Sequence, residues 1–213
     1  DLNRGKIMDY KAGYVYHIKD SYFEKVQDDK LMKNKEKGNF RPTFYCLKDN
    51  KTSLLWVVPL SSQADKYQNL ADKQSQKYGK SLGIYIDEFD GRKAAFLLQN
   101  MFPITENYLH HIHTRNGNPV PVKISTQKEI KDRIIKIRKL AAHGRKVVFP
   151  DIMRLEQLML EELKQSVLEN ESLSGKNVPF KEQVQSMEQW ADNIAERAAE
   201  QKQNDIEHNS GER

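Results

Sequence analysis

Ser61 and Ser62 are the residues of this sequence best placed to do chemistry, because they directly follow an apolar stretch at 54–60. Apolar and β-branched residues in such a stretch predict a buried strand, and we expect Pro59 to end it because proline cannot donate to a sheet ladder. A helix is expected to begin at Ser62, since serine is a good N-cap, with Lys66 on the same face. Two hydroxyls, the free N–H groups of a first helical turn and a lysine could bind or cleave a phosphodiester. An ordinary serine-capped helix is the alternative.

Cleavage of RNA without a metal is the reaction that these residue types support best. It needs a base for the 2′-hydroxyl, an acid for the leaving 5′-oxygen, and cations or hydrogen-bond donors around the phosphorus. Ser61, Ser62 and Lys66 offer such donors, and Arg41 enters the strand expected to pair with the stretch before Ser61. Arg41 could therefore reach the same part of the sheet, although an exposed arginine at a strand edge has the same sequence pattern.

Other chemistries find less support in the sequence. His110, His111 and His113 could form a zinc pair, but neither a cysteine nor a paired carboxylate completes such a site. Surface or groove histidines are therefore favoured, and a general-acid role for one of them is compatible with the sequence. The single cysteine, Cys46, stands in an apolar stretch, which favours a buried structural thiol and excludes an internal disulfide. No Gly-x-Ser-x-Gly elbow or glycine-rich phosphate loop is present. We expect neither a metal nor a cofactor.

The hydrophobic pattern changes near residue 126 from a period of two, typical of strands, to a period of 3.6, typical of helices. We expect strands over 12–18, 43–47, 53–58, 83–86 and 94–98, with a turn at 90–91 and an edge piece over 118–122. Helices are expected from residue 22, over 62–76, over 126–142, from residue 151 and over 179–203, and a lysine-rich loop over 33–38. This order predicts an α+β fold, with a compact, mostly antiparallel β-core wrapped by helices and a C-terminal helical extension.

Charge is distributed unevenly along the chain. Residues 1–150 hold 28 Lys and Arg against 16 Asp and Glu, whereas residues 151–213 hold 7 against 14. A basic body favours a polyanionic partner, and the acidic end could be a solvated helix, an assembly element or a cover for the basic surface. We expect an N-terminal tail over 1–13, one domain over 14–170, and a linker with an acidic helical extension over 171–213. One cysteine, no signal-peptide pattern and no run of eighteen apolar residues predict a cytoplasmic protein without membrane contact.

Five short stretches, in order, resemble the ToxN/AbiQ family of bacterial endoribonuclease toxins and, within it, the CptN-like branch. They are similar to an opening strand followed by a serine- and tyrosine-bearing helix, a basic residue before a strand, a Pro-Leu-(Thr/Ser)-Ser turn, a strand ending in Met-x-Pro-Ile, and a basic helix. The matching residues are 14–23, 41–45, 59–62, 97–104 and 128–142. The resemblance covers residues 14 to about 165, and it rests on the order and spacing of these stretches together.

The resemblance implies a β-barrel core like that of the MazF/Kid toxins, with added helices. It also implies metal-independent cleavage of RNA to 2′,3′-cyclic phosphate and 5′-hydroxyl ends, within a type III toxin–antitoxin system. The partner would be a small structured RNA antitoxin, which the toxin cuts from a repeat transcript and then holds in a closed toxin–RNA assembly. The family's usual roles are antiphage defence by abortive infection and plasmid maintenance.

The resemblance also implies roles for particular residues. Ser61 and Ser62 would contact the scissile phosphate, with Tyr22 and Arg41 lining the same groove. The family has a lysine two or three residues after the second hydroxyl, whereas this chain has Ala and Asp there. Either Lys66, one residue further on, takes that role, or another cation does.

RNA binding would rest on basic and aromatic side chains outside the serine turn. Phosphate contacts are expected from Lys33, Lys35, Lys37, Lys131 and Lys139, and base contacts from Tyr22, Tyr67 and His111. Each lysine, taken singly, could equally be an ordinary solvated charge. A non-catalytic RNA- or DNA-binding module with the same basic face is the alternative function. A third is a protein-assembly factor whose C-terminal helix docks a partner through Met187, Trp190 and Ile194.

Overall fold

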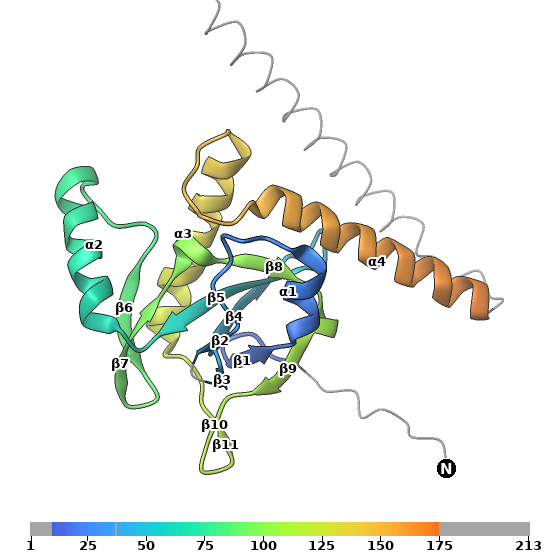
Figure 1. The fold of residues 1–213 in the computed structure, drawn as a ribbon, viewed down its shortest axis with the longest axis horizontal. Helices are drawn as coiled ribbons and strands as arrows, with labels where there is room; N and C mark the ends of the chain where they lie inside the picture. Colours follow the sequence, from blue (N-terminus) through green and yellow to red (C-terminus); the bar gives the residue numbers. More distant parts are fainter. Residues whose placement is uncertain (1–9, 37, 175–213) are drawn as a thin grey trace, which may run out of the picture.

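The computed structural model of the protein describes residues 10–36 and 38–174, which form a seven-stranded sheet flanked by helices (Figure 1). The sheet strands are β1 (Val15–Ile18), β4 (Thr43–Lys48), β5 (Leu55–Ser61), β6 (Tyr85–Phe89), β7 (Arg92–Phe96), β8 (Phe102–Ile104) and β9 (Leu109–Ile112). Two small hairpins pair β2 (Lys35–Glu36) with β3 (Asn39–Phe40), and β10 (Thr114–Arg115) with β11 (Asn118–Pro119). The helices are α1 (Asp20–Val26), α2 (Ala64–Tyr78), α3 (Ile124–Ala142) and α4 (Ile152–Ser174), with 3-10 turns η1 (Leu98–Asn100) and η2 (Glu106–Tyr108).

The sheet is antiparallel throughout and open. Its strands follow the order β6-β7-β5-β4-β1-β9, with β8 also beside β5. Among the described residues β6 and β9 stand at opposite ends of this order and do not pair with each other. Side chains meet there, since His113, directly after β9, lies with its ring centroid 5.3 Å from that of Phe89 at the end of β6. The expected α+β class and mostly antiparallel sheet are therefore confirmed, whereas the sheet does not close into the expected barrel.

Strand β5 is central, and it does not end at Pro59 as its sequence suggested. One edge of β5 pairs with β4, and the other pairs first with β8 at Leu55–Val57 and then with β7 at Leu60 and Ser61. Pro59 stands where the neighbour changes, and its carbonyl accepts the N–H of Leu97 at 2.9 Å. Because the partner strand changes at this position, the N–H that proline lacks costs the sheet no hydrogen bond. The strand therefore continues through Pro59 to Ser61.

Both faces of β5 are covered, which explains its continuous apolar sequence. Trp56, Val58 and Leu60 pack with the isoleucine stripe of α3, whereas Leu55 and Val57 pack with α1 and α4. The stripe expected from the 3.6-residue period has Ile130, Ile134 and Ile137 fully buried, and its last member, Ala141, partly buried. Figure 1 shows α2 standing beside β6 and β7, away from α1 and α4.

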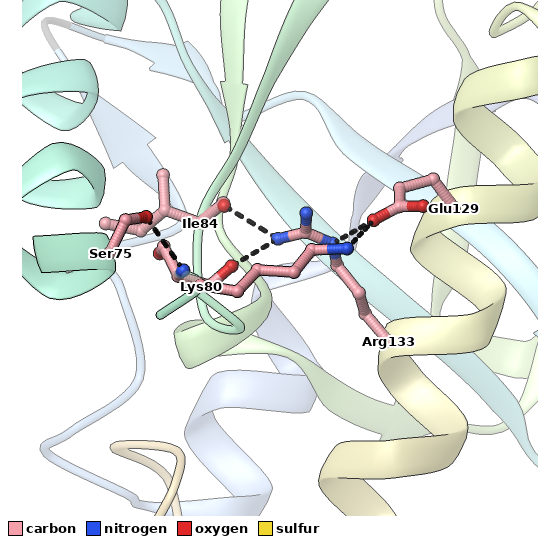
Figure 2. A network of polar contacts seen from close by, with 6 residues as sticks. Ser75, Lys80, Ile84, Glu129 and Arg133 are labelled. Atoms are coloured by element: carbon pink, nitrogen blue, oxygen red, sulfur yellow. Dashed lines mark hydrogen bonds and ion pairs between the residues drawn. The ribbon is translucent and has the colours of Figure 1, made fainter. Parts of the chain in front are cut away.

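Arg133 of α3 fixes the loop between α2 and β6 in place (Figure 2). Its Nη1 donates to the carbonyl oxygens of Ser81 at 2.6 Å and Ile84 at 3.0 Å, and its Nε lies 2.8 Å from Glu129. Lys80 of the same loop lies 2.8 Å from Glu129, and these two cations lower the pKa of the Glu129 carboxyl to about 2. Because this loop leads into β6, the network determines where the β6–β7 hairpin stands.

The end of the described chain is α4, which continues past the expected domain limit at residue 170 to Ser174. The expected C-terminal helix at 179–203 lies outside the described residues, as do residues 1–9 and Lys37. The division of the chain into a domain and an extension therefore stays a prediction. None of the helices in the described part combines the length and the apolar composition that crossing a bilayer needs.

Candidate active site

A groove of about 460 Å³ lies at the end of β5, where the two serines stand. Four segments line it: β3 with its link to β4, the end of β5, the β6–β7 hairpin and the start of the β9–β10 connection. The lining residues are Asn39, Phe40, Arg41, Pro42, Leu60, Ser61, Ser62, Phe89, Asp90, Arg92, Lys93, Ala94 and His113. Strand register explains why these segments lie together. The start of β4 pairs with the end of β5 (Thr43 opposite Pro59), and Ala95 of β7 lies opposite Ser61.

The two serines line the groove, but neither caps a helix. Ser61 is the last residue of β5 and only 7% exposed, and its Oγ accepts the N–H of Gln63 at 3.2 Å. Ser62 is exposed, and its hydroxyl has no hydrogen-bond partner among the described residues. Helix α2 begins at Ala64 with Gln63 as its N-cap, so the expected helix start at Ser62 is wrong. Because β5 extends through Pro59 to Ser61, Ser62 and Gln63 form the link between the strand and the helix.

Arg41 directly precedes β4, which pairs with the edge of β5 opposite to β7, and its side chain is held in place by backbone oxygens. Its Nε donates to the carbonyl of Lys33 at 3.0 Å and its Nη1 to the carbonyl of Leu60 at 3.3 Å. Its own N–H donates to the carbonyl of Asn34 at 2.6 Å. These contacts orient a guanidinium at the groove beside the serines. The structure therefore brings together three of the residues expected at the site, namely Arg41, Ser61 and Ser62.

Lys66 and Tyr22, the other two expected site residues, are not among the residues that line the groove. Ser62 precedes α2, so the four-residue spacing does not bring it onto one helix face with Lys66, whose Nζ lies 5.7 Å from the centre of the Tyr67 ring. Tyr22 is fully buried in the core, where burial raises its pKa well above the ordinary range. Its hydroxyl donates to the carbonyl of Pro103 at 3.0 Å.

Two cations of the groove, Arg92 and Lys93, were not expected from the sequence. They begin β7 directly after the tight turn at Asp90 and Gly91. Arg92 has no ion pair or hydrogen bond from its side chain among the described residues, and Lys93 lies 3.5 Å from the 95%-exposed Asp65. An ion pair this exposed is weak, so both cations can bind an incoming anion. The sequence shows that Arg92 and Lys93 follow the turn, but it does not show the pairing of β7 with β5 that places them near Ser61.

A cluster of four imidazoles borders the groove. The rings of His17 and His111 stack with centroids 4.4 Å apart, and Nδ1 of His111 lies 2.7 Å from Nδ1 of His110. Burial and then the neighbouring imidazoles lower the pKa of His17 to about 4, and burial with His110 and His113 lowers the pKa of His111. His113 itself lines the groove, with Nε2 3.3 Å from Asp90. No group of three or more His, Cys, Asp or Glu residues suited to a metal ion occurs in the described part of the chain.

The remaining expected RNA-binding residues lie at several places on the surface. Lys33, Lys35, Lys131 and Lys139 are all exposed. Lys35 pairs with Asp20 and lies over the Phe40 ring, with Nζ 4.5 Å from its centroid, so it stands close to one groove wall. Lys131 and Lys139 are on α3 and outside the groove, and Tyr67 of α2 packs partly buried against a small core cluster between α2 and the β6–β7 hairpin.

The fold of this chain is similar to that of a protein of known structure. The sequence matches no protein-family profile and no curated protein. Among solved structures, the chain resembles AbiQ, a lactococcal anti-phage endoribonuclease belonging to the type III toxin–antitoxin system. The TM-score is 0.53 at 16% sequence identity, and the match covers 72% of this chain and 99% of AbiQ. The resemblance expected from the five sequence stretches is thus confirmed as a shared fold over nearly all of AbiQ.

Proposed function

We propose that this chain is the toxin of a type III toxin–antitoxin system, an endoribonuclease that cleaves RNA without a metal. The observation that carries the proposal is the groove. It sets Arg41, Ser61 and Ser62 beside the unexpected cations Arg92 and Lys93, on a fold shared with an anti-phage endoribonuclease. Three positive charges and an exposed hydroxyl around one concave site favour a phosphodiester over a neutral ligand.

The groove residues would act on the phosphate rather than on the bases. Arg41 from one wall, and Arg92 and Lys93 from the other, would stabilise the negative charge that grows on the non-bridging oxygens as the 2′-oxygen attacks phosphorus. The exposed hydroxyl of Ser62 would donate to one of these oxygens, while Ser61 holds the turn. The products would be a 2′,3′-cyclic phosphate and a 5′-hydroxyl. In this arrangement the cation expected at Lys66 is replaced by Arg92 and Lys93.

RNA outside the cleaved bond would be bound by surface charges and rings. Lys33 and Lys35 beside the groove, and Lys131 and Lys139 on α3, would contact phosphates, so that affinity falls steeply with salt. His111 and Phe40 would stack on unpaired bases, since imidazole and phenyl rings next to a basic groove suit single-stranded RNA. Lys37 and Tyr67 remain predicted RNA contacts on the same reasoning from sequence.

The partner would be a small structured RNA antitoxin, which this chain cuts from a repeat transcript and then binds in a closed toxin–RNA assembly. The natural setting would be the cytoplasm of a bacterium, with a role in abortive infection of phage-infected cells or in plasmid maintenance. AbiQ is an anti-phage endoribonuclease of a type III system, and this supports the role by fold likeness. Membership of the CptN-like branch stays a prediction.

Substituting Ser62 tests the site with little risk to folding, because its side chain is exposed. We expect Ser62→Ala to slow cleavage of a mixed-sequence RNA by roughly 10²-fold, as the loss of one positioned donor typically does. Ser125→Ala is the matched control, since Ser125 is an exposed serine on α3 outside the groove. Equal cleavage by the two variants would remove Ser62 from the site, and wild-type protein that binds RNA without cutting it would favour the non-catalytic binding module.

A further inference from the structure

Cleavage in the groove requires a residue that can exchange a proton near neutral pH. As the 2′-oxygen bonds to phosphorus, the bond from phosphorus to the 5′-oxygen breaks, and that oxygen keeps the electron pair and needs a proton. Lysine and arginine side chains hold their protons at neutral pH, and a serine hydroxyl does not release its own. His113 is the one groove-lining residue of the described chain whose side-chain type ordinarily titrates close to pH 7.

The backbone and neighbours of His113 hold its ring at the groove wall. Its N–H donates to the carbonyl of Val15 at 2.8 Å, and its carbonyl accepts the N–H of Val120 at 3.2 Å. The imidazole lies between two rings, with its centroid 5.3 Å from Phe89 and 5.9 Å from His17. About 23% of the side chain remains exposed, which leaves the ring open to a ligand in the groove.

Asp90 is fixed so that it faces this imidazole. Its Oδ2 lies 3.3 Å from Nε2 of His113, and its Oδ1 lies 3.0 Å from Nε of Arg115, which also donates through Nη2 to the Asp90 carbonyl at 2.9 Å. The turn depends on Gly91, where φ is +72° and an added Cβ would stand 3.1 Å from the Arg115 guanidinium. A carboxylate held in this way orients an imidazole.

We propose that His113 is the general acid of RNA cleavage in this groove and that Asp90 is its positioning residue, an inference that rests on the proposed endoribonuclease function. The imidazolium gives its proton to the leaving 5′-oxygen while the 2′-hydroxyl proton passes to water. Arg41 and the serines hold the phosphate across the groove. Asp90 keeps the ring aimed, and it takes no part in the proton transfer itself.

Several charged or titratable groups face His113. Asp90 of the β6–β7 turn lies 3.3 Å from its Nε2, with Arg115 of β10 paired to that carboxylate, and His17 of β1 and His111 of β9 lie near enough to interact with it electrostatically. The pKa of His17 is lowered to about 4, so this nearest imidazole is neutral at pH 7 and adds no charge beside His113. Because an acid works only while protonated, the cleavage rate is expected to fall as pH rises through the range where imidazole loses its proton.

A pair of RNA substrates tests the role directly. One is an ordinary oligonucleotide containing the linkage that the wild-type protein cuts, and the other carries a bridging 5′-sulfur at that linkage. Sulfur leaves as a thiolate without needing a proton. We expect His113→Gln to cleave ordinary RNA at least about 10²-fold more slowly than wild type. The same variant should cleave the 5′-sulfur RNA within a few-fold of wild type.

Two controls separate a chemical role from a structural one. His143→Gln changes an exposed histidine at the end of α3 outside the groove, and it should cleave both substrates at the wild-type rate. Asp90→Asn should slow cleavage of ordinary RNA less than His113→Gln does. Its cleavage of the 5′-sulfur RNA should also be close to the wild-type rate. The wild-type protein alone provides a further test. Its cleavage rate should fall with rising pH on ordinary RNA but not on the 5′-sulfur RNA.

Other results would overturn the proposal. His113→Gln that cuts ordinary RNA at the wild-type rate would exclude His113 as the acid, as would equal losses on both substrates by protein that still binds RNA. A wild-type pH profile that is identical on the two substrates would do the same. Failure of the proposed function is a separate outcome, because wild-type protein would then leave both substrates intact.

Discussion

Glu156 of α4 offers the sharpest prediction about stability, because it is a carboxylate buried beside another carboxylate. Its side chain is 4% exposed, and Oε1 lies 2.9 Å from Nη2 of Arg138. Nη1 of the same guanidinium lies 2.6 Å from Asp49, so two acids share one cation. Burial raises the pKa of Glu156 to about 7 despite Arg138. Burial acts on Asp49 in the same sense, but the hydrogen bond from Arg138 and backbone N–H groups bring its pKa below the ordinary value.

Replacing Glu156 by Gln keeps an acceptor for Arg138 and removes the ionisation. The folded-state pKa of about 7 lies above the ordinary 4.5, so the unfolded chain releases this proton first as pH rises. The stability contributed by protonated Glu156 is therefore complete below about pH 4.5 and is lost as pH rises through about 7. The gap between the two pKa values corresponds to about 3 kcal/mol, since one pKa unit is about 1.4 kcal/mol. Relative to wild type, Glu156→Gln should gain about this much between pH 4.5 and pH 8.

Urea unfolding of the variant and the wild type over that pH range measures the difference. Glu161→Gln is the matched control, because Glu161 is an exposed glutamate on the same helix, and its difference from wild type should stay nearly constant. Unfolding free energies of Glu156→Gln and wild type that run parallel from pH 4.5 to 8 would refute the reasoning. They would mean that Glu156 is ionised at no cost inside the protein.

Three other substitutions test the parts of the structure that position and charge the groove. Arg133→Met should lower the free energy of unfolding by roughly 2–4 kcal/mol in urea titrations, because it leaves two buried carbonyl oxygens without their donor, whereas Glu129 keeps Lys80 as its partner. Lys93→Gln should weaken RNA binding and reduce the magnitude of its log–log salt slope by about 1, whereas Lys73→Gln on α2 should change neither. Gly91→Ala should lower the midpoint of thermal unfolding, because φ is +72° and the new Cβ would meet Arg115 at 3.1 Å; an unchanged midpoint would mean that the turn relaxes freely.

Patterns that depend on neighbouring residues along the chain could be predicted from the sequence. The isoleucine stripe of α3 and the turn at 90–91 follow from periodicity and turn composition, and both are present. The pairing of the strand after Arg41 with the strand before Ser61 follows from their separation by a short turn. This is why Arg41 and the serines could be expected to meet.

Features that depend on strand register or on tertiary neighbours could not be predicted. Pro59 continues a strand only because the partner of β5 changes there, and this depends on β7 and β8, which come some 35 to 45 residues later. The same pairing sets Arg92 and Lys93 beside the serines, so a local reading of the sequence could not assign them to the site. Tyr22 was expected in the groove by resemblance, but the packing of α1 buries it against Phe102.

The most direct test of the central claim is an RNA cleavage assay on purified protein, stripped of bound RNA, in excess EDTA. We expect mixed-sequence RNA to be cut at defined positions, with new 3′ ends that resist phosphatase until acid opens the cyclic phosphate, and with new 5′ ends that polynucleotide kinase labels without prior phosphatase treatment. Folded protein that binds RNA but leaves it intact in both EDTA and magnesium would contradict the claim that this groove is the active site of a metal-independent endoribonuclease.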